Sequence, residues 1–98
     1  MTRVALVVEM EVYPEYGEVF ADLIQQHAMT SLQQETGCLQ FAAHIDKTNR
    51  NRYVVYELFK SARALEKHRQ SPHQTKFRQT LDHMVKQRKS LELLPLEK

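Results

Sequence analysis

The chain has few of the residues that form disulfides, tight turns and phosphate-binding loops. Its 98 residues include one cysteine, two glycines, three prolines and no tryptophan. A lone cysteine cannot form a disulfide within the chain, which fits a reducing compartment, so we expect a cytoplasmic protein. The isolated glycines, Gly17 and Gly37, exclude the glycine-rich phosphate loops of Rossmann and P-loop proteins.

Long hydrophobic runs and an excess of one charge are also missing. No apolar segment approaches the roughly 20 residues that cross a bilayer, and no signal peptide precedes the first strand pattern. The 14 basic residues are interleaved with 12 acidic ones, and the densest basic run, Lys86 to Lys89, is short. We therefore expect no membrane and no nucleic-acid partner. The length predicts one domain over residues 1–98.

Alternating apolar residues predict three strands, at Val4–Val12, Cys38–Asp46 and Arg52–Phe59. A polar loop of residues 47–51 joins the last two as an antiparallel hairpin. A fourth strand is expected at the end of the chain, with Pro95 inside it. Because proline cannot donate a ladder hydrogen bond, this strand is expected at the sheet edge. Its apolar residues are Leu91, Leu93, Leu94 and Leu96.

Two segments have helical spacing. The first is expected from Pro14 to Gln34, followed by a terminating turn at Gly37. Its apolar stripe is Phe20, Leu23, Ile24, His27 and Leu32. The second is capped by Ser61, breaks and restarts at Pro72, and ends near the run Lys86–Lys89. At the restart, Ser71 is the expected cap and Gln74 is expected to complete a capping box.

This order of elements predicts an α+β fold of the ferredoxin-like βαββαβ type, with a four-stranded antiparallel sheet and helices on one face. The third strand is apolar on both of its faces. One face carries Val54, Tyr56 and Leu58, and the other carries Tyr53, Val55 and Phe59. Because the helices cover only one face, we expect a homodimer to cover the other. Whether the last strand pairs within its own chain or across the dimer stays open.

Three polar residues are candidates for chemistry. His73 precedes Phe77 by one helical turn and His68 follows Leu65 by three residues, so both imidazoles are expected to face the sheet. Each is equally explained as a core histidine bonded to backbone. Glu57 interrupts an apolar strand face, where its pKa would tend upward. It is a candidate base or histidine orienter, or else it forms a structural ion pair with Arg52 or another basic residue.

Metal and thiol chemistry are not expected. The chain has five histidines, but their spacing matches no zinc motif, so we expect no metal. Cys38 has no flanking charge that would activate it, and we expect a small buried side chain. The shape of a pocket between sheet and helices would depend on five aromatic residues, Phe20, Phe41, Tyr53, Phe59 and Phe77.

Two segments make the chain recognisable. They are the run from Arg52 to His68 followed by Ser71-Pro72-His73 and Phe77, and Glu35-Thr36-Gly37-Cys38-Leu39 with Phe41 and Asp46. Together they resemble the antibiotic biosynthesis monooxygenase family over nearly the whole chain. The resemblance implies a dimeric α+β barrel and an enzyme that needs no cofactor. The expected reaction is oxidation of a small quinol or polyketide-like aromatic by O₂, with His73 as the first choice of base, and His68 and Glu57 beside it.

The resemblance leaves two alternatives. Some members isomerise a phosphorylated autoinducer-2 type sugar, and the run Tyr56-Glu57-Leu58-Phe59-Lys60 is similar to theirs. In that case Lys60 or Arg69 would meet the phosphate. The other alternative is a dimer without catalytic activity that binds a small aromatic ligand. Family membership alone does not choose among the three.

Overall fold

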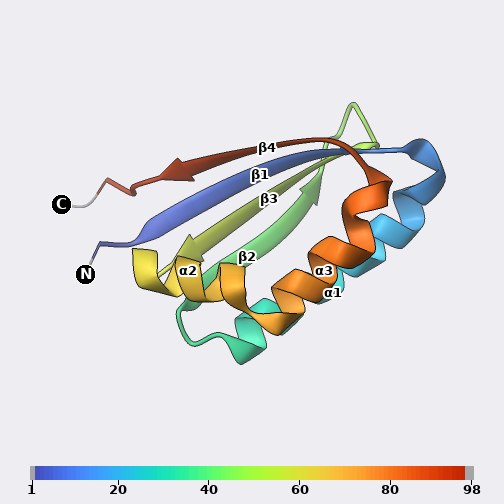
Figure 1. The fold of residues 1–98 in the computed structure, drawn as a ribbon. Helices are drawn as coiled ribbons and strands as arrows, with labels where there is room; N and C mark the ends of the chain where they lie inside the picture. The colour runs from blue at the N-terminus through green and yellow to red at the C-terminus, as the bar shows by residue number, and fades with distance from the viewer. Residues whose placement is uncertain (1, 97–98) are drawn as a thin grey trace.

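The computed structural model describes residues 2–96 and contains a four-stranded antiparallel sheet (Figure 1). The strand order is β2-β3-β1-β4, with each neighbouring pair antiparallel. The strands are β1 (Val4–Val12), β2 (Cys38–Ile45), β3 (Arg52–Phe59) and β4 (Val85–Leu93). The alternation of apolar residues therefore located the first three strands to within one residue, and the predicted fold class is confirmed.

Three α-helices lie on one side of the sheet (Figure 1). They are α1 (Gly17–Gln34), α2 (Ala62–Gln70) and α3 (Pro72–Leu81), with 3-10 turns η1 (Pro14–Tyr16) and η2 (Asp82–Met84). The break between α2 and α3 falls where Pro72 predicted it. Ser61 and Ser71 cap the two helices by accepting hydrogen bonds from the backbone N–H groups of Ala64 and Gln74. Within residues 2–96, no helix is both long and apolar enough to span a membrane.

The core lies between the helices and the inner face of the sheet. Phe20, Phe59 and Leu81 are fully buried, and Val12 and Val55 are nearly so. Burial of such side chains contributes roughly 1.5–3 kcal/mol each, which makes this layer the main source of stability. The predicted inward stripe of the first helix is right for Phe20, Ile24 and His27 and wrong for Leu32, which is 43% exposed. Ala28 and Ser31 take the inward positions instead.

The last strand differs most from expectation. It was predicted at Leu91–Leu96 with Pro95 inside, but β4 begins at Val85, and Pro95 lies beyond its end. The basic run Lys86–Lys89, expected at a helix end, belongs to β4. Charged residues are common on edge strands because they discourage pairing with another sheet. The edge position was therefore predicted correctly, but the reason given, a proline inside the strand, was wrong. The strand β4 pairs with β1 of the same chain.

Gly37 lies in the turn that follows α1, as predicted, and its φ is not positive. The position allows a close approach, because a Cβ added there would lie 2.6 Å from Cβ of Ala64. The role expected of Gln74 is wrong. Gln74 does not complete a capping box, since its side-chain oxygen accepts a hydrogen bond from Nε2 of His27 at 2.7 Å.

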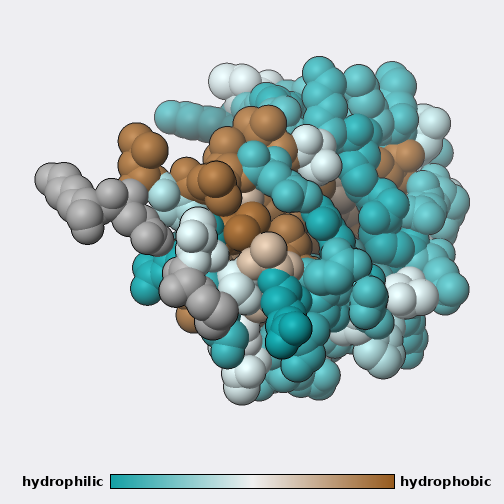
Figure 2. All heavy atoms as spheres, turned by 60° about the vertical axis from the view of Figure 1, so that its left-hand side comes forward, coloured by the Kyte–Doolittle hydropathy of each residue, from teal (hydrophilic) through white to brown (hydrophobic). Residues whose placement is uncertain are grey.

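The outer face of the sheet has no layer of helices over it, and it is rich in apolar residues. In β3, Val54 and Tyr56 are half-buried, and in β4, Leu91 and Leu93 are 60% and 40% exposed. The registers Val7↔Tyr56 and Val7↔Leu91 place these side chains next to one another. Figure 2 shows hydrophobic side chains gathered beside the chain ends, where β1 begins and β4 finishes.

Candidate functional site

His68 is held between two carboxyl groups that come from different layers of the fold. It belongs to α2 and is 2% exposed. Its Nδ1 donates a hydrogen bond to Oε2 of Glu35, the residue that follows α1, at 2.8 Å. Its Nε2 lies 3.8 Å from Oε1 of Glu57 in β3. Because Glu35 accepts at Nδ1, that nitrogen carries a proton, and in the neutral ring it is Nε2 that holds the lone pair.

Glu57 is a carboxyl group in the middle of the sheet. In the strand register it lies opposite Leu6 of β1 on one side and Phe41 of β2 on the other, and its side chain is buried, with 5% of the residue exposed. Its Oε1 has no hydrogen-bond partner, since 3.8 Å to His68 is too long for one. Burial, and to a smaller extent the charge of Glu35, raises the pKa of Glu57 to about 8, against the opposing effect of Arg69. Glu57 is therefore mostly protonated at neutral pH.

Of the basic residues considered as ion-pair partners of Glu57, Arg52 is ruled out. Arg52, the first residue of β3, pairs with Glu9 of β1 and with Asp46. The predicted upward tendency of the pKa of Glu57 follows from the same isolation. An unpaired carboxyl group in a poorly solvated position is one of the recurring features of sites that transfer protons.

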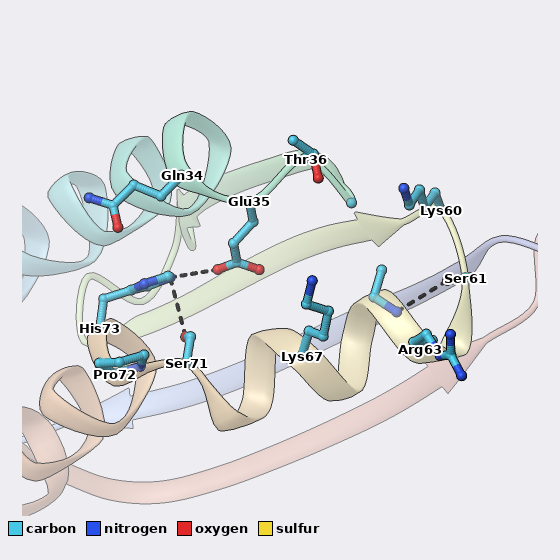
Figure 3. Close-up of a pocket in the computed structure, with 12 residues that line it drawn as sticks. Gln34, Glu35, Thr36, Lys60, Ser61, Arg63, Lys67, Ser71, Pro72 and His73 are labelled. Carbon is cyan, nitrogen blue, oxygen red and sulfur yellow. Dashed lines mark hydrogen bonds and ion pairs between the residues drawn. The ribbon is translucent and has the colours of Figure 1, made fainter.

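His73 joins the group from the first turn of α3. Its Nε2 donates to the same Oε2 atom of Glu35 at 2.5 Å, and the hydroxyl of Ser71 lies 3.4 Å away (Figure 3). Glu35 thus links two imidazoles from two helices. The expectation that both histidines face inward is confirmed for His68, whereas His73 is half-buried at the edge. Neither is a core histidine whose ring bonds only to backbone.

His27 of α1 is a third buried imidazole, and it forms part of the wall. Its ring stacks on Phe77 with centroids 3.8 Å apart, and its Nε2 donates to Gln74. Burial lowers the pKa of His27 to about 4, so the ring is neutral at pH 7. With one nitrogen engaged and a strongly lowered pKa, His27 is a poor proton acceptor near neutrality.

These groups separate two cavities. The inner pocket, of about 140 Å³, lies between sheet and helices and contains Phe41, Phe77, His27, Glu57 and His68 in its lining. A cavity of about this size holds one benzene-sized ring. The outer cleft, of about 620 Å³, lies between residues 34–37 and α2 and contains Glu35 and His73 (Figure 3). His68 therefore faces the inner pocket, and His73 faces the outer cleft.

The five aromatic residues expected around a pocket divide into two groups. Phe41 and Phe77 line the inner pocket. Phe20 and Tyr53 pack against each other with centroids 4.8 Å apart, and Phe59 is completely buried beside His68. These three belong to the core that supports the site. Cys38 is also buried as expected, and burial raises the pKa of its thiol to about 12, which keeps it protonated.

Glu35, His68 and His73 offer one carboxylate and two imidazoles whose donor atoms lie within 4.8 Å of one another. By donor type this set is able to hold a divalent ion. In the structure, however, the shared Glu35 oxygen accepts hydrogen bonds from both rings, so the group is already satisfied without one. Motif spacing did not reveal the cluster because its members come from three separate segments.

Glu35 and His27 are the site residues that sequence reasoning missed. Glu35 lies just beyond the end of α1, where a charged residue is ordinarily solvent-exposed. His27 was assigned only to the helix stripe. The clue in the sequence was a third histidine on an inward stripe, because histidine is only intermediate in its tendency to be buried.

Comparison with known proteins identifies the family of the chain and its fold. The family model described as antibiotic biosynthesis monooxygenase matches residues 3–80. No curated protein matches the chain. Similar structures include a provisionally named antibiotic biosynthesis monooxygenase from Nitrosomonas europaea, with TM-score 0.91 and 21% identity over 97% of this chain and 91% of that one.

Two further structures share the fold. A protein of unknown function from Bacteroides thetaiotaomicron, described as a possible oxidoreductase, has TM-score 0.89 and 18% identity over 96% of this chain and 98% of that one. A provisionally named monooxygenase from Fusobacterium nucleatum has TM-score 0.92 and 24% identity. The matched region covers 98% of this chain and 44% of that one. At these identities the structures establish the fold alone.

The raised pKa of Glu57 predicts how stability depends on pH. The folded protein keeps this proton up to about pH 8, whereas the unfolded chain releases it near the ordinary value of 4.5. The stabilisation is therefore complete below pH 4.5 and is lost as the pH rises to about 8. Glu57→Gln removes this pH dependence. Between pH 4.5 and about pH 8, the free energy of unfolding of the wild type should therefore fall by on the order of a few kcal/mol relative to that of the variant. Urea unfolding of both proteins across this range measures the difference, and parallel curves would contradict the account.

Proposed function

Because the chain belongs to the antibiotic biosynthesis monooxygenase family, we propose that it oxidises a small quinol or polyketide-like aromatic with O₂ and needs no cofactor. The observation that carries the proposal is the pairing of His68 and Glu57 at the inner pocket. His68 offers an unprotonated Nε2, and Glu57 offers a protonated carboxyl group 3.8 Å from it. Neighbouring groups of opposite protonation state are arranged for acid–base chemistry.

The surroundings of the pair support the same chemistry. Phe41 and the stacked Phe77 and His27 rings give the pocket flat apolar walls that suit an aromatic ring. The pocket is small, so a larger polyketide would extend past its rim, where Arg78 and Arg88 lie. An apolar environment also favours electron transfer from the substrate anion, because the anion is poorly solvated there.

The reaction begins with transfer of the substrate hydroxyl proton to His68 Nε2. The phenolate passes one electron to O₂, and the resulting radical and superoxide combine as a peroxide at a ring carbon. His68 returns its proton to the peroxide. The O–O bond then breaks, and the distal oxygen takes a proton from Glu57 and leaves as water. The ring carbon loses its own proton in the same step, and this proton restores the protonated Glu57. One oxygen atom remains in the quinone product and the other leaves in water.

Within this scheme His73 acts through Glu35. The two hydrogen bonds at Glu35 Oε2 fix the ring orientation of His68 and keep the proton on Nδ1. We therefore assign the base role to His68, in place of the initial preference for His73. His73 and Glu35 are positioning residues.

Oxygen uptake tests this assignment. With a panel of quinols and anthrone-like phenols, His68→Gln should lower turnover by roughly 10² to 10⁴, the usual contribution of one acid–base group. His73→Gln should cause a smaller loss, while His83→Gln, on the surface against Tyr16, serves as the matched control with unchanged turnover. Equal losses for His68 and His73 would contradict the assignment, and absence of uptake with every substrate would contradict monooxygenation.

The second candidate is an isomerase of a phosphorylated sugar. The same His68 and Glu57 are suited to moving a proton between adjacent carbons of a ketone, since one accepts and the other donates. Incorporation of solvent deuterium without oxygen uptake would favour this reaction. Saturable binding without either turnover would favour a ligand-binding protein.

We also propose that two copies associate through the outer sheet face. The single free cysteine is typical of a reducing compartment, so we propose that this dimer works in the cytoplasm. A face bearing Tyr56, Leu91 and Leu93 would leave a contiguous apolar patch in water. A two-fold axis would place the same apolar patch of a second copy against this one, so that each copy covers the other.

Leu91→Glu should convert the dimer to a monomer, because it places one charge from each copy in a buried apolar contact. Val19→Glu, at an exposed position of α1, is the matched control and should stay dimeric. Light scattering at micromolar concentration gives the mass of each protein. A monomeric wild type would contradict the proposal.

A further inference from the structure

The outer cleft is a second cavity, separate from the inner pocket. It shares no lining residue with that pocket. Its volume of about 620 Å³ lies in the range of small-molecule sites. It lies between the turn of residues 34–37 and α2, so its walls come from segments far apart in the chain (Figure 3). The proposed oxidation uses the inner pocket and leaves this cleft without a role.

Positive charge gathers in the lining of the cleft. Lys60 follows β3, and Arg63 and Lys67 come from α2. Within residues 2–96 none of these three takes part in an ion pair, whereas five other basic residues do: Arg52, Arg69, Arg78, Lys86 and Arg88. Lys67 extends from α2 into the space in front of Glu35 (Figure 3). The cleft therefore brings together three cations that no side chain in the described region neutralises.

The one acidic residue in the lining is already engaged. Oε2 of Glu35 accepts hydrogen bonds from His68 and His73, and within residues 2–96 no lysine or arginine nitrogen lies within 4 Å of it. The hydroxyl of Thr36 also lines the cleft, whereas the hydroxyl of Ser71 already donates to the carbonyl of His68 at 2.8 Å. The lining thus offers positive charge and hydrogen-bond donors, the combination that binds phosphate and carboxylate groups.

The floor of the cleft is tightly built. Gly37 packs so closely on α2 that an added Cβ would lie 2.6 Å from Cβ of Ala64 and 3.5 Å from Cε of Lys60. The backbone N–H of Lys60 donates to the carbonyl of Gly37 at 2.9 Å. These contacts fix the turn against α2 and hold the bases of the basic side chains at a set separation. The backbone of the site therefore needs no further ordering when a ligand binds, and the cost of ordering falls on the exposed side chains of Lys60, Arg63 and Lys67.

We propose that the outer cleft binds a small organic dianion, a molecule carrying a phosphate or a pair of carboxylates, through Lys60, Arg63 and Lys67. Lysine binds such groups as a compact charge, and arginine adds directed N–H donors. The cleft is larger than a bare phosphate ion, so it has room for the organic part of the ligand. This proposal does not depend on the reaction at the inner pocket.

An NMR titration with inorganic phosphate tests the proposal. Phosphate is added to the full chain at constant ionic strength, with chloride as the balancing anion, and the backbone amide signals of Thr36, Gly37, Arg63 and Ala64 are followed. Saturable shifts confined to the cleft are expected. The double variant Lys60→Gln/Lys67→Gln should weaken the fitted affinity by roughly tenfold or more, the loss expected when charge-assisted contacts disappear.

Lys47→Gln is the matched control, because Lys47 is an exposed lysine in the loop between β2 and β3, away from the cleft. It should leave the affinity unchanged. A parallel titration with succinate separates a phosphate preference from a carboxylate preference. Non-saturating shifts, or equal weakening by Lys47→Gln, would overturn the proposal. Glu57→Gln should bind phosphate normally, so failure of this site and failure of the proposed oxidation are distinguishable.

Discussion

The hydrogen bond from His68 to Glu35 is the contact on which the rest of the site depends. It joins α2 to the end of α1, fixes which ring nitrogen of His68 carries a proton, and turns the other nitrogen toward Glu57. Without an acceptor at Nδ1, a buried imidazole would be free to exchange tautomers and to rotate. Glu57 gains its significance from the same arrangement, because its Oε1 has no hydrogen-bond partner among the described residues and His68 Nε2 lies 3.8 Å from it.

The helix break at Pro72 and the close contact at Gly37 explain how one small fold supports two cavities. The break lets His73 approach Glu35 from α3 while His68 approaches it from α2. The contact of Gly37 with Ala64 holds the turn that carries Glu35 against α2. The triad of Glu35, His68 and His73 then forms a wall, with an apolar pocket on one side and a basic cleft on the other.

Much of the fold followed from local patterns. Alternation located β1 and β3 exactly because each has one consistently buried face, and Pro72 marked the helix break because its ring cannot continue the preceding turn. The pattern failed in β4, where exposed charged residues on an edge strand give no alternation to read. The site was only partly predictable. His68 and Glu57 interrupt apolar faces and can be noticed, but Glu35 gains its role from contacts across 33 and 38 residues, which no local spacing reveals.

The central claim is that His68 holds its proton on Nδ1 and keeps Nε2 free beside a protonated Glu57. The ¹⁵N chemical shifts of the His68 ring at neutral pH test it most directly, because protonated and unprotonated imidazole nitrogens resonate far apart. The account predicts a protonated Nδ1 and an unprotonated Nε2. A ring protonated at Nε2 alone, or at both nitrogens, would contradict it, since His68 would then have no lone pair facing the inner pocket.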